Sequence, residues 1–336
     1  MKNITITLLL ALVFVSSCKK DSNPPVTDVY VVGYQKIGTK SVATLWKNGQ
    51  ATLLSTGQIN EYANAVYVAG TDVYVAGYED NGIIPYVVKL WKNGEETFLT
   101  DGVNAAIARD VCVAGANVYV VGAENNGTKY VAKVWKNGSP KALTNGQQNA
   151  DANSVYVNGA DVYVAGSEFT GLANTAKVWK NGVPTALSNG LLNATASSVY
   201  VVGADVYVAG KEENSNFKNV AKVWKNGVPT SLTDGLQNAY ATEVKVVGGD
   251  VYVAGAEFNG AKNIAKIWKN GVASSLTNGQ NSATLTSCYL SGANVFATTY
   301  EYNGTNYAAT LWKNGIATNL TNGQVDTWVN SVFVVN

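Results

Sequence analysis

The sequence contains no histidine, only one arginine and only one methionine in 336 residues. Histidine is the side chain whose charge changes closest to neutral pH, and it is a very common ligand of transition metals. Catalysis by Ser-His-Asp or Cys-His groups and zinc sites built on histidine are therefore excluded. With Arg109 alone, no cluster of guanidinium groups can form to bind phosphate or carboxylate. Catalysis by carboxylates alone stays possible, and we expect no cofactor and no bound metal.

Charge is also scarce. Only 14% of the residues are charged, and 24 Lys and Arg nearly balance 23 Asp and Glu. This balance provides no basic surface for nucleic acid, so no nucleic-acid partner is expected. Glycine (33 residues) and tyrosine (19 residues) are plentiful, and valine recurs at short intervals. Such a composition is typical of an all-β protein with many tight turns.

The first 17 residues read as a signal peptide, with Lys2 before an apolar run that is too short to span a membrane. The following sequence, Val-Ser-Ser-Cys ending at Cys18, resembles the lipobox of bacterial lipoproteins. That resemblance implies lipid attachment at Cys18, and Lys19 after it favours the outer membrane, in a periplasmic or surface-exposed position. An ordinary signal peptide with a chance cysteine is the alternative. Residues 18–27 form the lipidated cysteine and a short polar tether, and residues 28–336 form one domain.

That domain consists of seven repeats. The tetrapeptide Trp-Lys-Asn-Gly recurs every 44 or 45 residues, beginning at Trp46, Trp91, Trp135, Trp179, Trp224, Trp268 and Trp312. Each repeat predicts four short antiparallel strands, and Asn-Gly between the last two is a strong signal for a type I′ hairpin. In the fourth repeat a longer loop, Ser167 to Asn174, joins the second and third strands. Four antiparallel strands in about 44 residues are typical of a propeller blade.

Proline and side-chain alternation indicate how the blades are arranged. Pro140, Pro184 and Pro229 occupy one equivalent site, and because proline cannot donate to a strand ladder we place the fourth strand at the outer edge. Strand alternation predicts one face with Val155 and Val164, and an opposite face that carries Tyr163 and Trp179. We expect the aromatic face of each blade to pack on the valine and alanine face of the next.

The ends of the domain predict a closed ring. The domain begins at Asp28 with the second strand of a blade and finishes near Val334 with a first strand. The last strand would therefore complete the opening blade, which would remove the exposed sheet edges. The prediction is an all-β, seven-bladed β-propeller with four antiparallel strands per blade, closed by pairing of the C-terminal strand with the N-terminal blade. A monomer is expected.

The repeats resemble bacterial propeller repeats of the type VYVAG…WKNG…LT(D/N)G, over essentially all of residues 28–336. Proteins with this pattern have no settled activity, so the resemblance implies a fold and no function.

Two rings of residues are candidates for a binding face, since both fall near loops that share one side of a propeller. The first ring could bind cations or sugar hydroxyls, or could simply pair with the lysines before each tryptophan. Its members are Glu79, Glu124, Glu168, Glu212, Glu257 and Glu301, with Gln35 in the remaining blade. The second ring varies between repeats, and either stacks on sugars or a partner protein, or has drifted free of packing. Its candidates are Tyr62, Arg109, Asp151, Tyr240 and Trp328.

Three functions are compatible with these observations. The first is a membrane-anchored, non-catalytic module of the bacterial envelope that binds a glycan or an envelope protein. The second is a carboxylate-dependent carbohydrate-active enzyme, a glycosidase or a lyase, at the mouth of the channel, although no pair within the glutamate ring departs from the repeat. The third is a structural spacer in an envelope complex. Cys112 and Cys288 fall in non-adjacent repeats, so we expect buried, unpaired thiols and no disulfide.

Overall fold

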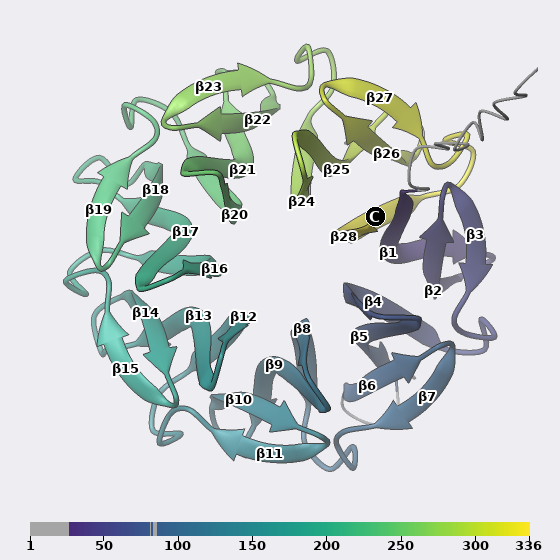
Figure 1. The fold of residues 1–336 in the computed structure, drawn as a ribbon, viewed down its shortest axis with the longest axis horizontal. Helices are drawn as coiled ribbons and strands as arrows, with labels where there is room; N and C mark the ends of the chain where they lie inside the picture. Colours follow the sequence, from purple (N-terminus) through teal and green to yellow (C-terminus); the bar gives the residue numbers. More distant parts are fainter. Residues whose placement is uncertain (1–26, 81, 83–85) are drawn as a thin grey trace, which may run out of the picture.

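The computed structural model describes residues 27–80, 82 and 86–336, and these form seven four-stranded antiparallel sheets arranged around an axis. Figure 1 shows the seven blades, with the first strand of each nearest the axis and the fourth at the rim. The predicted all-β, seven-bladed propeller is confirmed. Among the described residues no helix is long and apolar enough to cross a membrane.

We refer to the blades as A to G in chain order. Blade A contains β28 (Thr327–Val335), β1 (Asp28–Ile37), β2 (Lys40–Lys47) and β3 (Gln50–Leu53). Blade B contains β4 (Asn60–Ala69), β5 (Asp72–Asp80), β6 (Val87–Lys92) and β7 (Glu95–Phe98). Blade C contains β8 (Ala106–Ala114), β9 (Asn117–Asn125), β10 (Tyr130–Lys136) and β11 (Ser139–Ala142). Blade D contains β12 (Ala150–Asn158), β13 (Asp161–Phe169), β14 (Asn174–Lys180) and β15 (Val183–Ala186). Blade E contains β16 (Ala194–Val202), β17 (Asp205–Glu213), β18 (Asn219–Lys225) and β19 (Val228–Ser231). Blade F contains β20 (Ala239–Val247), β21 (Asp250–Phe258), β22 (Asn263–Lys269) and β23 (Val272–Ser275). Blade G contains β24 (Ala283–Ser291), β25 (Asn294–Tyr302), β26 (Tyr307–Lys313) and β27 (Ile316–Asn319).

The ring closes within blade A. The C-terminal strand β28 pairs with β1 from Asp28↔Val335 to Gln35↔Thr327, with one bulge. The last strand of the chain is therefore the innermost strand of the first blade, as predicted, and Figure 1 shows β28 beside β1.

The Asn-Gly turns have the backbone that a type I′ hairpin requires. Asn181 and Gly182 have φ angles of 54° and 88°, and the same pair of positive values recurs in all seven copies. The asparagine side chain also ties its turn to the blade, because Asn181 Oδ1 accepts from Val162 N at 2.9 Å and its Nδ2 donates to Asp161. Local turn chemistry thus fixes the outer hairpin of every blade.

The packing between blades differs from the prediction in one respect. Val164 pairs directly with Trp179 across β13 and β14, so the tryptophan lies on the valine face and not on the tyrosine face. This face packs on Tyr119 and Ala132 of the preceding blade. The tryptophan side chains of the first six repeats are at most 1% exposed, and together with valine and alanine they form the core between blades.

Two further predictions are settled by the strands of blade D and its neighbours. Pro184 lies on the edge strand β15 opposite Trp179, as expected. The loop between the second and third strands is shorter than predicted, because Ser167 and Glu168 pair with Ala176 and Thr175 and so extend the ladder. Cys112 and Cys288 are buried and unpaired, as predicted.

Candidate functional site

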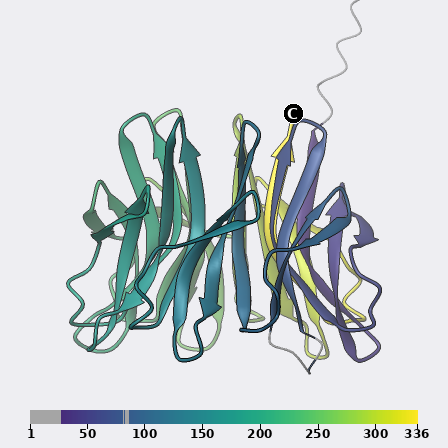
Figure 2. The same ribbon diagram turned by 90° about the horizontal axis from the view of Figure 1, so that it is seen from below.

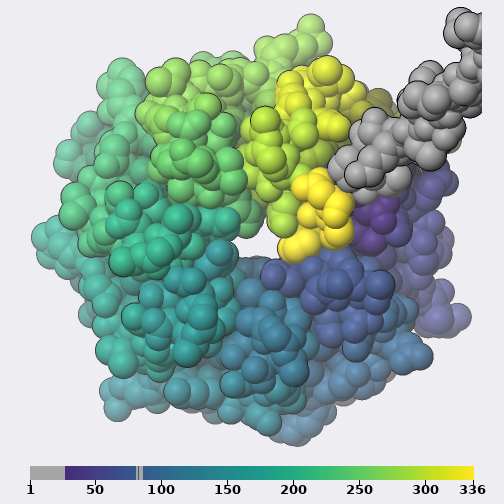
Figure 3. Space-filling view, in the orientation of Figure 1, coloured from purple at the N-terminus to yellow at the C-terminus, as the bar shows by residue number. Residues whose placement is uncertain are grey.

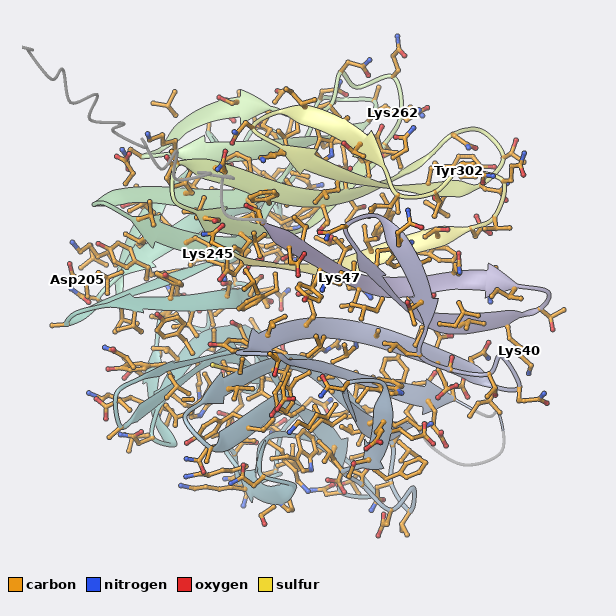
Figure 4. All side chains as sticks on the ribbon, turned by 45° about the vertical axis from the view of Figure 1, so that its right-hand side comes forward. Lys40, Lys47, Asp205, Lys245, Lys262 and Tyr302 are labelled. Carbon is orange, nitrogen blue, oxygen red and sulfur yellow. The ribbon has the colours of Figure 1, made fainter. Side chains whose placement is uncertain are left out.

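The two faces of the ring are unlike. The face that we call the turn face carries the turns between the first and second strands, and Thr27 lies there, with its hydroxyl 3.4 Å from Asn336 Oδ1. The opposite face, the loop face, carries the connections from second to third strands and from blade to blade. Figure 2 shows the inner turns and the C-terminus at one side and these loops at the other. In Figure 4, Asp205 of the turn face and Tyr302 of the loop face mark opposite ends of the molecule.

The predicted glutamate ring is formed, but it is largely neutralised. Lys133 Nζ lies 2.7 Å from Glu124 and Lys266 Nζ lies 2.5 Å from Glu257, and Glu168 and Glu212 pair in the same way with Lys177 and Lys222. These cross-strand pairs are the structural alternative that the sequence left open. A ring of free carboxylates for a cation is not present in these four blades.

Blades B and G depart from this scheme. In blade B, Lys89 Nζ contacts Glu61 and Glu79 at 2.7 Å and Glu96 at 2.8 Å, and its side chain is only 4% exposed. In blade G, Glu301 faces no lysine among the described residues, and burial raises the pKa of its carboxyl group. Neither group is an open ligand site.

The variable ring, which also includes Asn153 and Asn330 at the sites equivalent to Arg109, contains both packing residues and exposed residues. Asn153 Nδ2 donates to the carbonyl of Ala196 in the next blade at 2.9 Å, and Asn330 donates in the same way to Ala63 across the closure of the ring. Arg109 and Asp151, in contrast, are both 45% exposed and approach to 3.9 Å. This pair lies on the loop face near the channel mouth, where the sequence placed it.

The structure brings Tyr62 and Trp328 into one aromatic cluster through a residue that the sequence did not single out, Tyr34. The ring of Tyr34 stacks on Trp328 with centroids 4.9 Å apart and contacts Tyr62 edge-on at 4.8 Å. Ring-to-ring contacts continue on both sides, with centroids 4.7 to 5.8 Å apart. The cluster, which we call the aromatic band, consists of Tyr300, Tyr302, Tyr307, Trp328, Tyr34, Tyr62, Tyr78 and Tyr86.

The aromatic band breaks the sevenfold symmetry, because it is confined to the consecutive blades G, A and B. The sites equivalent to Tyr34 carry Ala123, Ser167, Lys211 and Ala256 in blades C to F, as the strand registers show. Packing between blades therefore does not require an aromatic residue there. Tyr240 of blade F makes no ring-to-ring contact among the described residues, and so lies outside the band.

A second departure from the sevenfold symmetry lies in the central channel. The sequence alone did not predict a site there. Halfway along the inner strands, serine Oγ atoms accept from the backbone of the next blade, for example Ser154 from Val199 N at 3.3 Å. Blades C and F carry Asp110 and Glu243 at this position, and these side chains make the corresponding bonds to Val155 N (2.9 Å) and Cys288 N (2.7 Å). The sequence does contain the pattern that points to this site, since two carboxylates occupy a repeat position that is mostly serine.

Two residues further along each inner strand, an aromatic ring surrounds the channel. Tyr67, Phe333 and Tyr289 are neighbours with centroids 4.7 and 4.8 Å apart, and Tyr156 lies 4.8 Å from Tyr200. The two breaks in this ring are Cys112 in blade C and Lys245 in blade F, again above Asp110 and Glu243. These residues line a cavity of about 260 Å³, and Figure 3 shows the narrow opening at the axis.

The titration of these channel groups limits their chemistry. Burial raises the pKa of Asp110 to about 6, against the lowering effect of the Val155 N–H and of Lys245. Burial lowers the pKa of Lys245, but Glu243 at 2.6 Å outweighs this effect and raises the pKa above its usual value, so Lys245 stays protonated and is no amine nucleophile. Burial raises the pKa of the Cys112 thiol to about 12, which keeps it from acting as a thiolate. Within the described part of the chain, no three His, Cys, Asp or Glu side chains come together as a metal site.

Comparison with known proteins supports the fold alone. No protein-family model and no curated protein matches the sequence. Among solved structures, a puromycin-hydrolyzing peptidase of Mycobacterium tuberculosis is similar over 86% of this chain and 53% of its own, with a TM-score of 0.57 and 10% identity. Hydrazine synthase of Kuenenia stuttgartiensis is similar over 93% of this chain and 47% of its own, with a TM-score of 0.51 and 10% identity. The chain thus spans about half the length of each, and shares with them the propeller architecture.

Proposed function

We propose that this protein is a non-catalytic binding module of the bacterial envelope, held in the outer membrane by lipid on Cys18, and that its aromatic band binds a neutral glycan. The observation that carries the proposal is the confinement of eight contacting aromatic side chains to three blades of an otherwise repetitive loop face. Aromatic side chains with a polar tip suit ligands that present both apolar faces and hydroxyl groups.

The position of the band supports display away from the membrane. Thr27, the first described residue, lies on the turn face beside Asn336. The band lies at the strand ends and loops of the opposite face. A lipid anchor attached ahead of Thr27 would leave the loop face free to meet a ligand.

The charge around the band supports a neutral ligand. Beneath it, blade A has Gln35 in place of the glutamate, Glu79 is paired with Lys89, and the pKa of Glu301 is raised by burial. Charged side chains of both signs lie around the band, because Asp326 Oδ1 accepts from Tyr307 N at 2.8 Å, and Arg109 and Asp151 approach each other to 3.9 Å. Because these charged groups include both signs, they do not favour a polymer that carries one charge.

Binding to glycan arrays tests the proposal through substitutions borrowed from other blades. The double variant Tyr34→Ala, Trp328→Thr uses residues that other blades already carry. Blades C and F have alanine at the site of Tyr34, and blades E and G have threonine at the site of Trp328, so the fold should persist. We expect at least about tenfold weaker glycan binding, since aromatic anchors are the usual hot spots. Tyr240→Thr is the matched control outside the band and should bind normally. No signal on any neutral glycan counts against the proposal, and capture of an envelope protein by the band would favour a protein ligand.

The anchor is tested separately. Cys18→Ala is expected to move the protein from the membrane fraction to the soluble fraction, because a lipid chain can be attached only at that thiol. Cys112→Ala, which removes a buried thiol, serves as the control and should leave the protein with the membranes. Membrane association that persists in Cys18→Ala contradicts the lipoprotein assignment.

The second candidate is a carboxylate-dependent carbohydrate-active enzyme, and the observation in its favour is the placing of Asp110 and Glu243 in the channel. We rank it second because Asp110 already accepts from two backbone N–H groups and Glu243 from Lys245, Ser287 and Cys288. Hydrolysis of a glycan by the wild type that Asp110→Asn and Glu243→Gln abolish would place this candidate first. A purely structural spacer would show no ligand in either assay.

A further inference from the structure

We propose that the central channel beside Cys112 is a binding site for a primary alkylammonium group, held above Asp110 between Tyr67 and Tyr156. This site is independent of the aromatic band: it opens on the turn face, and its occupant is a small cation and not a neutral chain.

Blade F contains the pattern for this interaction within the protein itself. Glu243 stands at the serine position of β20, and Lys245 stands two residues further on, at the tyrosine position. The Lys245 ammonium group lies 2.6 Å from Glu243 and 5.5 Å from the ring centroid of Tyr200. An alkylammonium group in a gap of the aromatic ring, above a carboxylate and beside a tyrosine, is therefore an arrangement that this channel already holds.

Blade C repeats half of the pattern. Asp110 supplies the carboxylate at the serine position of β8, and the gap in the aromatic ring recurs, because the short Cys112 replaces a tyrosine or phenylalanine. Here no lysine fills the gap. Tyr67 and Tyr156, on the inner strands at either side, line the same cavity as Asp110 and Cys112. The cation that blade F carries on its own chain would have to come from outside.

The charge of the channel favours a cation in this position. The groups that face the cavity include two carboxylates, Asp110 and Glu243, and one ammonium group, Lys245. Burial of the Asp110 carboxylate is costly, and it raises the pKa of Asp110 even though Lys245, which lines the same cavity, lowers it. An added ammonium group would bring the three-residue cluster to neutrality.

Asp110 is not explained by packing alone. Its Oδ1 accepts from Val111 N at 2.8 Å, and its Oδ2 accepts from Val155 N. The first bond is needed because Ala65 of blade B has no side-chain oxygen to accept from Val111 N. Serine makes the second of these bonds in blades D, E and G, and serine in place of Ala65 would accept from Val111 N. Two uncharged serine residues could therefore make both hydrogen bonds, so hydrogen bonding does not require the negative charge of Asp110. A cationic ligand would.

Calorimetric titration with n-butylammonium chloride tests the site, with 1-butanol as the neutral probe of similar shape. We expect saturable binding of butylammonium and none of butanol. Asp110→Ser, which restores the residue of blades D and E, should weaken butylammonium binding at least about tenfold, and Asp110→Asn gives the same loss if the serine variant folds poorly. Trp328→Thr on the loop face is the matched control and should not change it.

Cys112→Lys gives the most direct readout, because it would build the pattern of blade F into blade C. We expect this variant to melt at a higher temperature than the wild type and to bind no butylammonium, since its own side chain would occupy the site. Equal binding of butylammonium and butanol, or binding that survives in Cys112→Lys, overturns the proposal. Neither result bears on glycan binding by the aromatic band, which is measured on the other face.

Discussion

Deletion of residues 327–336 is expected to open the propeller and to remove its cooperative thermal transition or lower its Tm by at least about 10 °C. These residues form β28, the innermost strand of blade A. Val329, Val332 and Val334 on this strand are 0 to 4% exposed, and burial of three such side chains contributes about 5 kcal/mol or more. A loss of this size is comparable with the whole stability of a typical domain.

The deletion would also leave β1 as an unpaired edge, which is a template for aggregation. Thermal melting and size-exclusion chromatography therefore measure the two consequences together. Removal of Asn336 alone is the matched control, because it spares the ladder between β1 and β28 and loses only side-chain bonds to Thr27 and Ser291. An unchanged melting curve after the full deletion would show that pairing of β28 does not hold the ring.

The parts of this fold that the sequence predicts are those determined by local chemistry. Asn-Gly requires positive φ at two consecutive residues, and this alone defines seven outer hairpins. Proline at the edge strand then orders the strands, and the incomplete first and last repeats predict the closure. Each of these inferences uses residues that are close in sequence or that repeat at a fixed period.

The side of the blade on which the tryptophan lies could not be obtained in this way. The sequence shows which residues alternate along β13 and along β14. It does not show which face of β14 lies on the same side of the sheet as a given face of β13, because that depends on which residues pair across the two strands. The pairing Val164↔Trp179 sets it, together with a loop that is shorter than the sequence suggested. An error of one residue in such a register moves every side chain to the opposite face.

The sequence listed Tyr62 and Trp328 as candidates, but it did not single out Tyr34 or the channel residues, for a related reason. Tyr34 and Trp328 lie near opposite ends of the chain and become neighbours only because the ring closes. In the channel, Asp110 and Lys245 belong to different blades and line one cavity only because the ring closes around the axis, where each favours the charged form of the other. In a protein of near-identical repeats, the residues that depart from the repeat deserve comparison around the ring as well as along the chain.

Blade B contains the clearest case of a charge that the fold cannot lose. The Lys89 ammonium group donates to Glu61, Glu79 and Glu96, and the side chains of Lys89, Glu61 and Glu79 are at most 9% exposed. Lys89→Met would keep much of the apolar stem and remove the one cation that, among the described residues, pairs with these two buried carboxylates. Breaking a buried pair in this way costs about 3–5 kcal/mol, so this variant should unfold at markedly lower urea concentration than the wild type.

Lys133→Met is the matched control, because Lys133 occupies the same position in blade C, is 21% exposed and has one glutamate partner. Its loss should cost about 1 kcal/mol or less, as for partly exposed pairs. Equal urea midpoints for the two variants would show that the three glutamates around Lys89 are solvated enough to need no partner, and that the cluster is an ordinary surface network.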